Sequence, residues 1–288
     1  MKQEILRFEN VTCKKDGAVY LDNFSFYMTA GEIVGLLSVN DRGIKELIEL
    51  MAKNHPIDAG RVYMGGKLVN SYLNQEETSN RIYQIDQKSS LINDLSITDN
   101  LFVMRPGFKK QVINEWVLRE QADRVLKQLS MDLDLNKRVE RLTTMERIMV
   151  EIAKAVSANC KVLILDEPTS SLTFNEVQSL FKTVEDLKKK GIAIIYITHR
   201  LTEVFEIATH VAIMRDGVIT LDGPVTNFTK EMLIQGLLPN DSQGAQQAAK
   251  AYEPVDLTLG RTCERRGIDP LDTAKYILSA RKALQESL

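Results

Sequence analysis

The chain has 288 residues, 44% of them hydrophobic and 26% charged, which is ordinary for a globular protein with one large domain or two modest ones. Its 37 basic and 39 acidic residues leave a net charge of −2, so no polybasic surface points to nucleic acid or to anionic lipid. No stretch reaches the roughly 18 apolar residues of a membrane span, and the first residues, MKQEILRFENVT, indicate a strand and not a secretion signal. Three widely spaced cysteines without metal-site spacing fit a reducing compartment, so we expect a cytoplasmic protein.

The first third of the chain is predicted to be rich in β-strands, separated by turn residues. Strands are expected at residues 5–8, 24–28, 33–37, 60–64 and 81–85. Between them, apolar residues recur at the spacing of one helical face, which predicts a helix over residues 44–52.

From about residue 96 the pattern becomes helical, and after residue 160 strands and helices alternate closely. Helices are expected from 96 onward and at 112–129, 145–156, 175–190 and 201–208, and strands at 162–165, 192–198, 211–214 and 218–221. Alternating strands and helices predict an α/β domain with a largely parallel sheet, into which the helical stretch is inserted.

The last part of the chain differs in residue composition from the rest. Residues 241–251 are rich in Ser, Gln, Gly and Ala, which is typical of a linker, and residues 270–288 have the pattern of an amphipathic helix. We therefore expect a main domain over residues 1–240 with a helical subdomain at about 88–157, a linker over 241–252 and a helical extension over 253–288. That helix could cap its own domain or bind a partner.

The strongest chemical signal is an apolar strand that ends in two acids, Asp166 and Glu167. Open α/β sheets bind ligands at the carboxyl ends of their strands. There, the first acid can hold Mg²⁺, and the second can orient or deprotonate a water molecule that attacks a phosphate. Acids after a strand are common, but the full string LILDEPTSSL at residues 163–172 is far more specific.

This string resembles the Walker B motif and D-loop of the ATP-binding cassette (ABC) ATPases. Residues 195–201, IYITHRL, resemble the H-loop of that family, in which a histidine, here His199, contacts the γ-phosphate. Gln87, before the helical stretch, resembles the Q-loop glutamine. The resemblance thus implies Glu167 and His199 as catalytic residues and Asp166 and Gln87 as metal ligands, with ATP and Mg²⁺ as cofactors if any are bound.

The resemblance covers about residues 4–240 and is most specific for sugar importers of the ribose and galactose type. Residues 31–37 resemble the strand that leads into the P-loop, and residues 149–157 and 222–236 are similar to the corresponding segments of those importers. It implies the α/β fold of a P-loop NTPase-type ABC nucleotide-binding domain, with a mixed sheet, a β-rich edge and an inserted helical subdomain.

The segment in the place of the phosphate-binding P-loop departs from the family pattern G-x-x-x-x-G-K-[S/T]. In that pattern glycines let backbone N–H groups approach the phosphates, the lysine pairs with phosphate oxygens and the hydroxyl ligates Mg²⁺. Here the eight residues are Ser38, Val39, Asn40, Asp41, Arg42, Gly43, Ile44 and Lys45. Gly43 matches, whereas Ser38 replaces a glycine, Asp41 adds a negative charge, and Ile44 and Lys45 replace the lysine and the hydroxyl.

A shift of one residue, with Lys45 acting as the lysine, does not restore the pattern. It would rotate the side chain by about 100° on the first helical turn, lose Gly43 and place Glu46 at the hydroxyl position. Losing the lysine removes a charge-assisted contact worth about 1.5–3 kcal/mol. We therefore expect ATP binding to be weak or absent.

The segment that resembles the signature motif, often LSVGEQ in sugar importers, is also altered. It consists of Leu142, Thr143, Thr144, Met145 and Glu146. Met145 replaces the glycine whose backbone faces the γ-phosphate bound by a partner cassette, and a side chain there crowds that phosphate. The family also has an aromatic residue that stacks on adenine; Lys15 stands near its expected place, and the strand at 5–8 and Tyr20 leave the position of that residue open.

In the family that the chain resembles, two cassettes enclose ATP and dock a membrane permease at the inner face of the cell membrane. The resemblance therefore implies a second cassette, in a homodimer or heterodimer, and a permease as partners. Three functions remain open: a degenerate subunit of a sugar importer, a regulatory or interaction protein outside transport, and a working ATPase with an unusual P-loop.

Overall fold

The computed structural model describes residues 3–15, 17–38, 43–53, 56–71, 81–86, 88–102 and 115–238. Contacts divide the chain into one compact unit over Lys2–Leu237 and another of Met1 with Leu238–Leu288, of which only Leu238 is described. The predicted linker over 241–252 and extension over 253–288 therefore lie outside the described residues. Among the described residues, no helix has the length and apolar character needed to cross a membrane.

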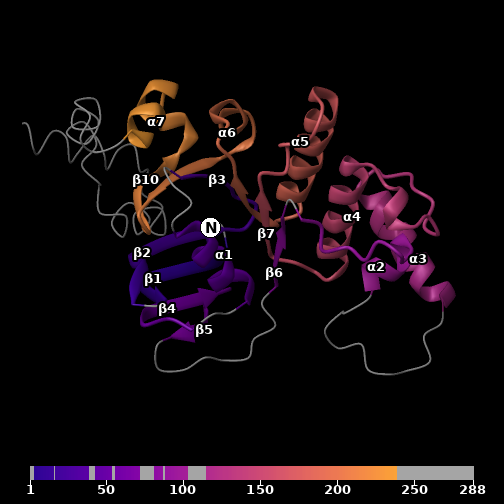
Figure 1. Cartoon of the computed structure of the whole chain (residues 1–288), viewed down its shortest axis with the longest axis horizontal. Helices are drawn as coiled ribbons and strands as arrows, with labels where there is room; N and C mark the ends of the chain where they lie inside the picture. Colours follow the sequence, from indigo (N-terminus) through magenta and orange to yellow (C-terminus); the bar gives the residue numbers. More distant parts are fainter. Residues whose placement is uncertain are drawn as a thin grey trace, which may run out of the picture. The chain divides into compact units, whose positions relative to one another are not determined.

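The first unit contains two sheets and their helices (Figure 1). In chain order its elements are β1 (Glu4–Lys15), β2 (Ala18–Thr29), β3 (Ile33–Ser38), α1 (Ile44–Lys53), β4 (Ala59–Met64), β5 (Lys67–Ser71), β6 (Ile82–Ile85), α2 (Ile97–Phe102), α3 (Glu115–Gln128), α4 (Thr144–Ser157), β7 (Val162–Asp166), α5 (Phe174–Lys189), β8 (Ala193–Ile197), α6 (Leu201–Ile207), β9 (His210–Arg215), β10 (Val218–Pro224) and α7 (Lys230–Leu237), with 3-10 helices at Val139–Arg141 and Val225–Asn227.

The predicted strands and helices are present, with differences at β1, β2, β5 and α7. The first two strands are much longer than predicted. Their pairing has register shifts, and Asn10 and Asn23 within them have φ of 49° and 47°. Such irregularities break the alternation of apolar and polar residues that marks a strand in a sequence. Strand β5 and helix α7 were not predicted.

The larger sheet has the strand order β10-β9-β3-β8-β7-β6. Strands β9, β3, β8, β7 and β6 run parallel, and β10 pairs antiparallel with β9 across the turn at Asp216 and Gly217. The smaller sheet, β2-β1-β4-β5, is antiparallel. Because parallel strands point the same way, the carboxyl ends of β3, β8, β7 and β6 share one edge of the larger sheet.

The larger sheet is buried on both faces, as expected for a mainly parallel sheet. In β7, Leu163 and Leu165 belong to a core shared with α4 and α5, whereas Val162 and Ile164 belong to a second core. That second core also contains apolar side chains of α1 and of the smaller sheet. Helix α1, which follows the β3–α1 loop in the sequence, is thus held by apolar packing.

Helices α2, α3 and α4 contact one another and form the predicted helical insertion (Figure 1). Asn100, which is 1% exposed, ties the start of this region together. Its Nδ2 donates to the carbonyls of Ile92 and Ser96, and its Oδ1 accepts from the Ile92 N–H. A buried amide with its bonds satisfied fixes the chain where it enters the insertion.

Candidate functional site

The two predicted catalytic residues lie side by side at the carboxyl edge of the larger sheet. Asp166 ends β7 opposite Ile197, the last residue of β8, and the Glu167 N–H donates to the Ile197 carbonyl at 3.0 Å. The Nε2 of His199 lies 2.6 Å from Oε1 of Glu167. The acid and the histidine that the sequence places about thirty residues apart therefore meet through the pairing of β7 with β8.

Glu167 has a strained backbone, with φ of 46°. This left-handed conformation costs a residue with a side chain about 1–2 kcal/mol, so the surrounding structure has to hold it. The side chain of Glu167 is 26% exposed and that of His199 is 63% exposed, so both reach the protein surface. This backbone conformation is found where the Glu167 carboxylate contacts His199, at the edge where ligands bind to sheets of this kind.

The loop that resembles the P-loop connects β3 to α1, and Val39, Asn40, Asp41 and Arg42 lie outside the described residues. Gly43, which follows them, has φ of 88°. A Cβ at Gly43 would lie 2.6 Å from Cε of Met214 and 2.8 Å from the carbonyl oxygen of Tyr20. Close packing and backbone conformation therefore both require glycine here, whether or not a phosphate is bound.

Ile44, in the place of the P-loop lysine, is 7% exposed and belongs to the core shared by α1 and the smaller sheet. Lys45, the next residue, is exposed. Since a one-residue step turns the side chain by about 100° around the helix, Lys45 does not replace the lysine's charge at the position of Ile44.

Glu46 occupies the N-terminus of α1 with its own carboxylate. Its Oε2 accepts a hydrogen bond from the Gly43 N–H at 3.2 Å. Backbone N–H groups at a helix N-terminus are the donors that bind phosphate oxygens in proteins with an intact P-loop. In the described part of this segment, an apolar side chain thus stands in the place of the cation, and a carboxylate accepts from one backbone donor.

The other predicted contacts of a nucleotide are also altered or lie outside the described residues. Near the predicted adenine position, Nζ of Lys15 lies 3.9 Å from Oε2 of Glu49 on α1, which makes a charged pair and not an aromatic platform. Gln87 lies outside the described residues. Within the described ranges, no group of three or more His, Cys, Asp or Glu side chains is arranged to hold a metal ion.

The segment that resembles the signature motif begins α4 and is closed by a capping box. The Thr143 hydroxyl accepts from the Glu146 N–H at 3.2 Å, and Glu146 Oε2 accepts from the Thr143 N–H at 2.8 Å. Leu142 is buried, and Met145 is partly buried against the core that α4 shares with α5. Burial alone would raise the pKa of Glu146, but hydrogen bonds from the Thr143 N–H and from Lys137 together lower it.

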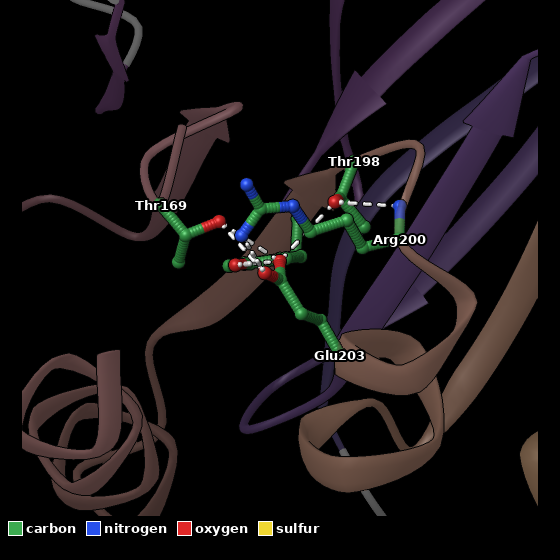
Figure 2. Close-up of polar contacts among 5 residues, drawn as sticks. Thr169, Thr198, Arg200 and Glu203 are labelled. Carbon is green, nitrogen blue, oxygen red and sulfur yellow. Dashed lines mark hydrogen bonds and ion pairs between the residues drawn. The ribbon is translucent and has the colours of Figure 1, made fainter. Parts of the chain in front are cut away.

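Two buried carboxylates, one on α6 and one on α4, were not predicted from the sequence. Glu203, on α6, is 5% exposed and accepts hydrogen bonds from Thr169, Thr198 and Arg200 (Figure 2). Glu151, on α4, is also 5% exposed and accepts from the hydroxyl of Ser89 at 2.6 Å. A glutamate inside an apolar helical face is the sequence signal that could have indicated such buried acids.

Comparison with known proteins identifies the family of this fold. A family model described as ABC transporter matches residues 21–170, more than half of the chain. The chain belongs to the ABC transporter family. The match includes the β3–α1 loop, the signature segment, Asp166 and Glu167.

This ABC cassette is similar to curated importers and to solved cassettes. It is 34% identical over 232 residues to the Ribose import ATP-binding protein RbsA of Clostridium perfringens (strain SM101 / Type A), covering 80% of this chain and 46% of that protein. It is 33% identical over 240 residues to the Galactose/methyl galactoside import ATP-binding protein MglA of Treponema pallidum (strain Nichols), covering 83% and 47%. The chain thus spans about half the length of these relatives.

A crystal structure of an ATP-binding cassette of an ABC transporter in its ADP conformation has the same fold. It superposes with a TM-score of 0.71 at 25% identity, over 84% of this chain and 97% of the solved one. The predicted fold class and the resemblance to ABC ATPases are therefore confirmed.

Proposed function

We propose that this cassette is the ATP-binding-type subunit of a sugar importer whose own phosphate loop binds ATP weakly or not at all. The observation that supports it is the start of α1, where Ile44 is buried in the lysine's place and Glu46 accepts from the Gly43 N–H. A triphosphate at this loop would meet a carboxylate and no lysine, and like charges close together are strongly unfavourable.

Sugar is the proposed substrate class because the relatives are named for the import of ribose and of galactose or methyl galactoside. The chain matches about half of each relative, so the activity of the whole relative is carried over as a proposal.

The proposed partners are a second cassette with an intact P-loop and a membrane permease, at the inner face of the cell membrane. Nucleotide and Mg²⁺ would then be held mainly by the second cassette. Asp166, Glu167 and His199 are proposed as the retained family residues of this chain, and Leu142–Glu146 as its signature segment. The proposed nucleotide-binding domain is residues 1–240.

A second candidate is a regulatory protein with a cassette fold that works outside transport. It is favoured by the changes on both surfaces that face ATP in the family, the P-loop segment and the signature segment. Fractionation separates the two. A transport subunit is expected in the membrane fraction and purifies in mild detergent with an integral membrane protein and a second cassette. Recovery from the soluble fraction without either favours the regulatory candidate.

The experiment that tests the loss of activity is ATP turnover by the purified chain beside Glu167→Gln. Both proteins are expected to show the same background rate, because the chain does not hold the triphosphate in place for attack. Turnover by the natural chain that Glu167→Gln abolishes would instead establish a working ATPase with an unusual P-loop.

A further inference from the structure

The carboxylate of Glu203 is the centre of a buried polar network behind the Glu167–His199 pair. Its Oε1 accepts from the Thr169 hydroxyl at 2.8 Å and from Nη1 of Arg200 at 3.2 Å. Its Oε2 accepts from the hydroxyls of Tyr196 at 2.7 Å and Thr198 at 3.2 Å. Figure 2 shows Thr169, Thr198 and Arg200 converging on this one side chain.

Three of the four donors come from the two loops that carry the candidate catalytic pair, and the fourth, Tyr196, lies in β8. Thr169 lies two residues after Glu167, on the loop that follows β7. Thr198 and Arg200 flank His199, and the Thr198 hydroxyl also accepts from the Arg200 N–H at 3.1 Å, which fixes the bend around the histidine. Glu203 itself is on α6, so one carboxylate on a third element joins both loops.

Because this network is buried, the loss of one of its hydrogen bonds is costly. Glu203, Thr169 and Thr198 are 5%, 2% and 3% exposed, so a lost hydrogen bond is not readily replaced by one to bulk water. Burial, together with the hydrogen bond that it donates to Glu203, raises the pKa of Tyr196, so its phenol remains a donor at neutral pH. The network therefore holds the donors and the Glu203 carboxylate in one arrangement, in which their hydrogen bonds are satisfied.

We propose that Glu203 is a positioning residue that fixes the loop after β7 against the loop after β8 and thereby keeps the Glu167 carboxylate in contact with His199. A buried acid that only stabilised the core could take its hydrogen-bond partners from any part of the protein. The partners of Glu203 include residues on both sides of His199 and one beside Glu167. The assignment of this pair as retained family residues rests on the proposed function, whereas the contact between the two side chains needs no nucleotide.

The test is NMR spectroscopy of the imidazoles of the full chain, which has 3 histidines. His199→Gln assigns the His199 signal, and Glu167→Gln shows where that signal moves when the carboxylate partner is lost. We expect Glu203→Gln and the milder Thr169→Val to move the His199 signal in the same direction as Glu167→Gln. His210, whose Nδ1 lies 2.9 Å from Glu32, is the internal reference and should not move.

Glu206→Gln is the matched control, because Glu206 is an exposed carboxylate one turn further along α6 and contacts Gln178. It should leave all the histidine signals in place. A purely structural role of Glu203 would lower the melting temperature of Thr169→Val and Glu203→Gln while the His199 signal stays at its natural position, and that result would overturn the proposal. ATP turnover by the natural chain would contradict the proposed function and leave this comparison unaffected.

Discussion

Gly43 matches the P-loop pattern for a reason that does not involve phosphate. Its φ of 88° and the approach of Met214 and of the Tyr20 carbonyl leave no room for a Cβ. A residue that fits the motif therefore has a packing role that survives the loss of the neighbouring lysine. The residue identities at this loop could be read from the sequence, but the contacts that make Gly43 necessary come from β2 and β9.

Gly43→Ala is expected to lower the free energy of unfolding by about 2–4 kcal/mol, through strain at positive φ and a clash with Tyr20. Gly191→Ala is the matched control, because Gly191 has φ of 82° and a Cβ added there would meet no other atom within 4 Å. It should lose only the strain, about 1 kcal/mol. Urea denaturation measures both, and equal losses would mean that the close contacts at Gly43 are unimportant.

Glu203 shows what could not be predicted at the residue scale. It was visible in the sequence as an acid near apolar positions, yet its partner in the loop after β7 is 34 positions away. Such pairings depend on which strands are adjacent, and the sequence pattern carries no direct information on strand order.

The capping box of α4 is the clearest local determinant at the element scale. Thr143 and Glu146 satisfy each other's backbone N–H groups at the start of the helix. This motif can be found in a sequence because its two residues are three positions apart. Most helices and strands of the main unit could be predicted for the same reason, whereas the long irregular strands β1 and β2 could not.

Thr143→Ala is expected to lower the free energy of unfolding by about 1 kcal/mol, because α4 loses its N-cap hydrogen bond. Thr144→Ala, at the adjacent exposed position, is the control and should change stability by less than about 0.5 kcal/mol. Chemical denaturation at neutral pH gives both values. Similar losses for the two variants would show that the cap contributes nothing of its own.

Glu146 gives this cap a pH dependence. Its folded pKa is lowered, so its contribution is present above the ordinary glutamate value of 4.5 and is lost as pH falls through the folded pKa. The stability difference between the natural protein and Glu146→Gln should therefore be constant above about pH 4.5 and shrink below it. Denaturation curves across this range check the sign, and a difference that grows as pH falls would contradict it.

At the scale of the whole molecule, the two described cysteines report on global unfolding. Cys13 and Cys160 are each 3% exposed, and burial raises the pKa of Cys160 to about 12. Since the thiolate is the reactive form, alkylation of either thiol should require opening of the core. Mass spectrometry after alkylation at increasing urea should show both modifications following the unfolding transition. Rapid modification of Cys160 in the native protein would contradict this burial.

The whole molecule combines an intact cassette fold with an altered phosphate loop. Fold class and family could be predicted, because long strings around Asp166 and His199 carry both. The capture of the Gly43 N–H by Glu46 could not, because it depends on a side-chain conformation. That contact makes Glu46 part of any repair of the loop, together with the positions that already depart from the family pattern.

The most direct measurement is a calorimetric titration of the purified chain with Mg-ATP, beside a repaired variant. The variant carries Ser38→Gly, Asp41→Gly, Ile44→Lys, Lys45→Ser and Glu46→Thr. We expect saturable binding by the repaired variant and none by the natural protein at the same concentrations. Micromolar binding by the natural protein, a binding free energy of about −8 kcal/mol, would contradict the inhibitory roles proposed for Ile44 and Glu46.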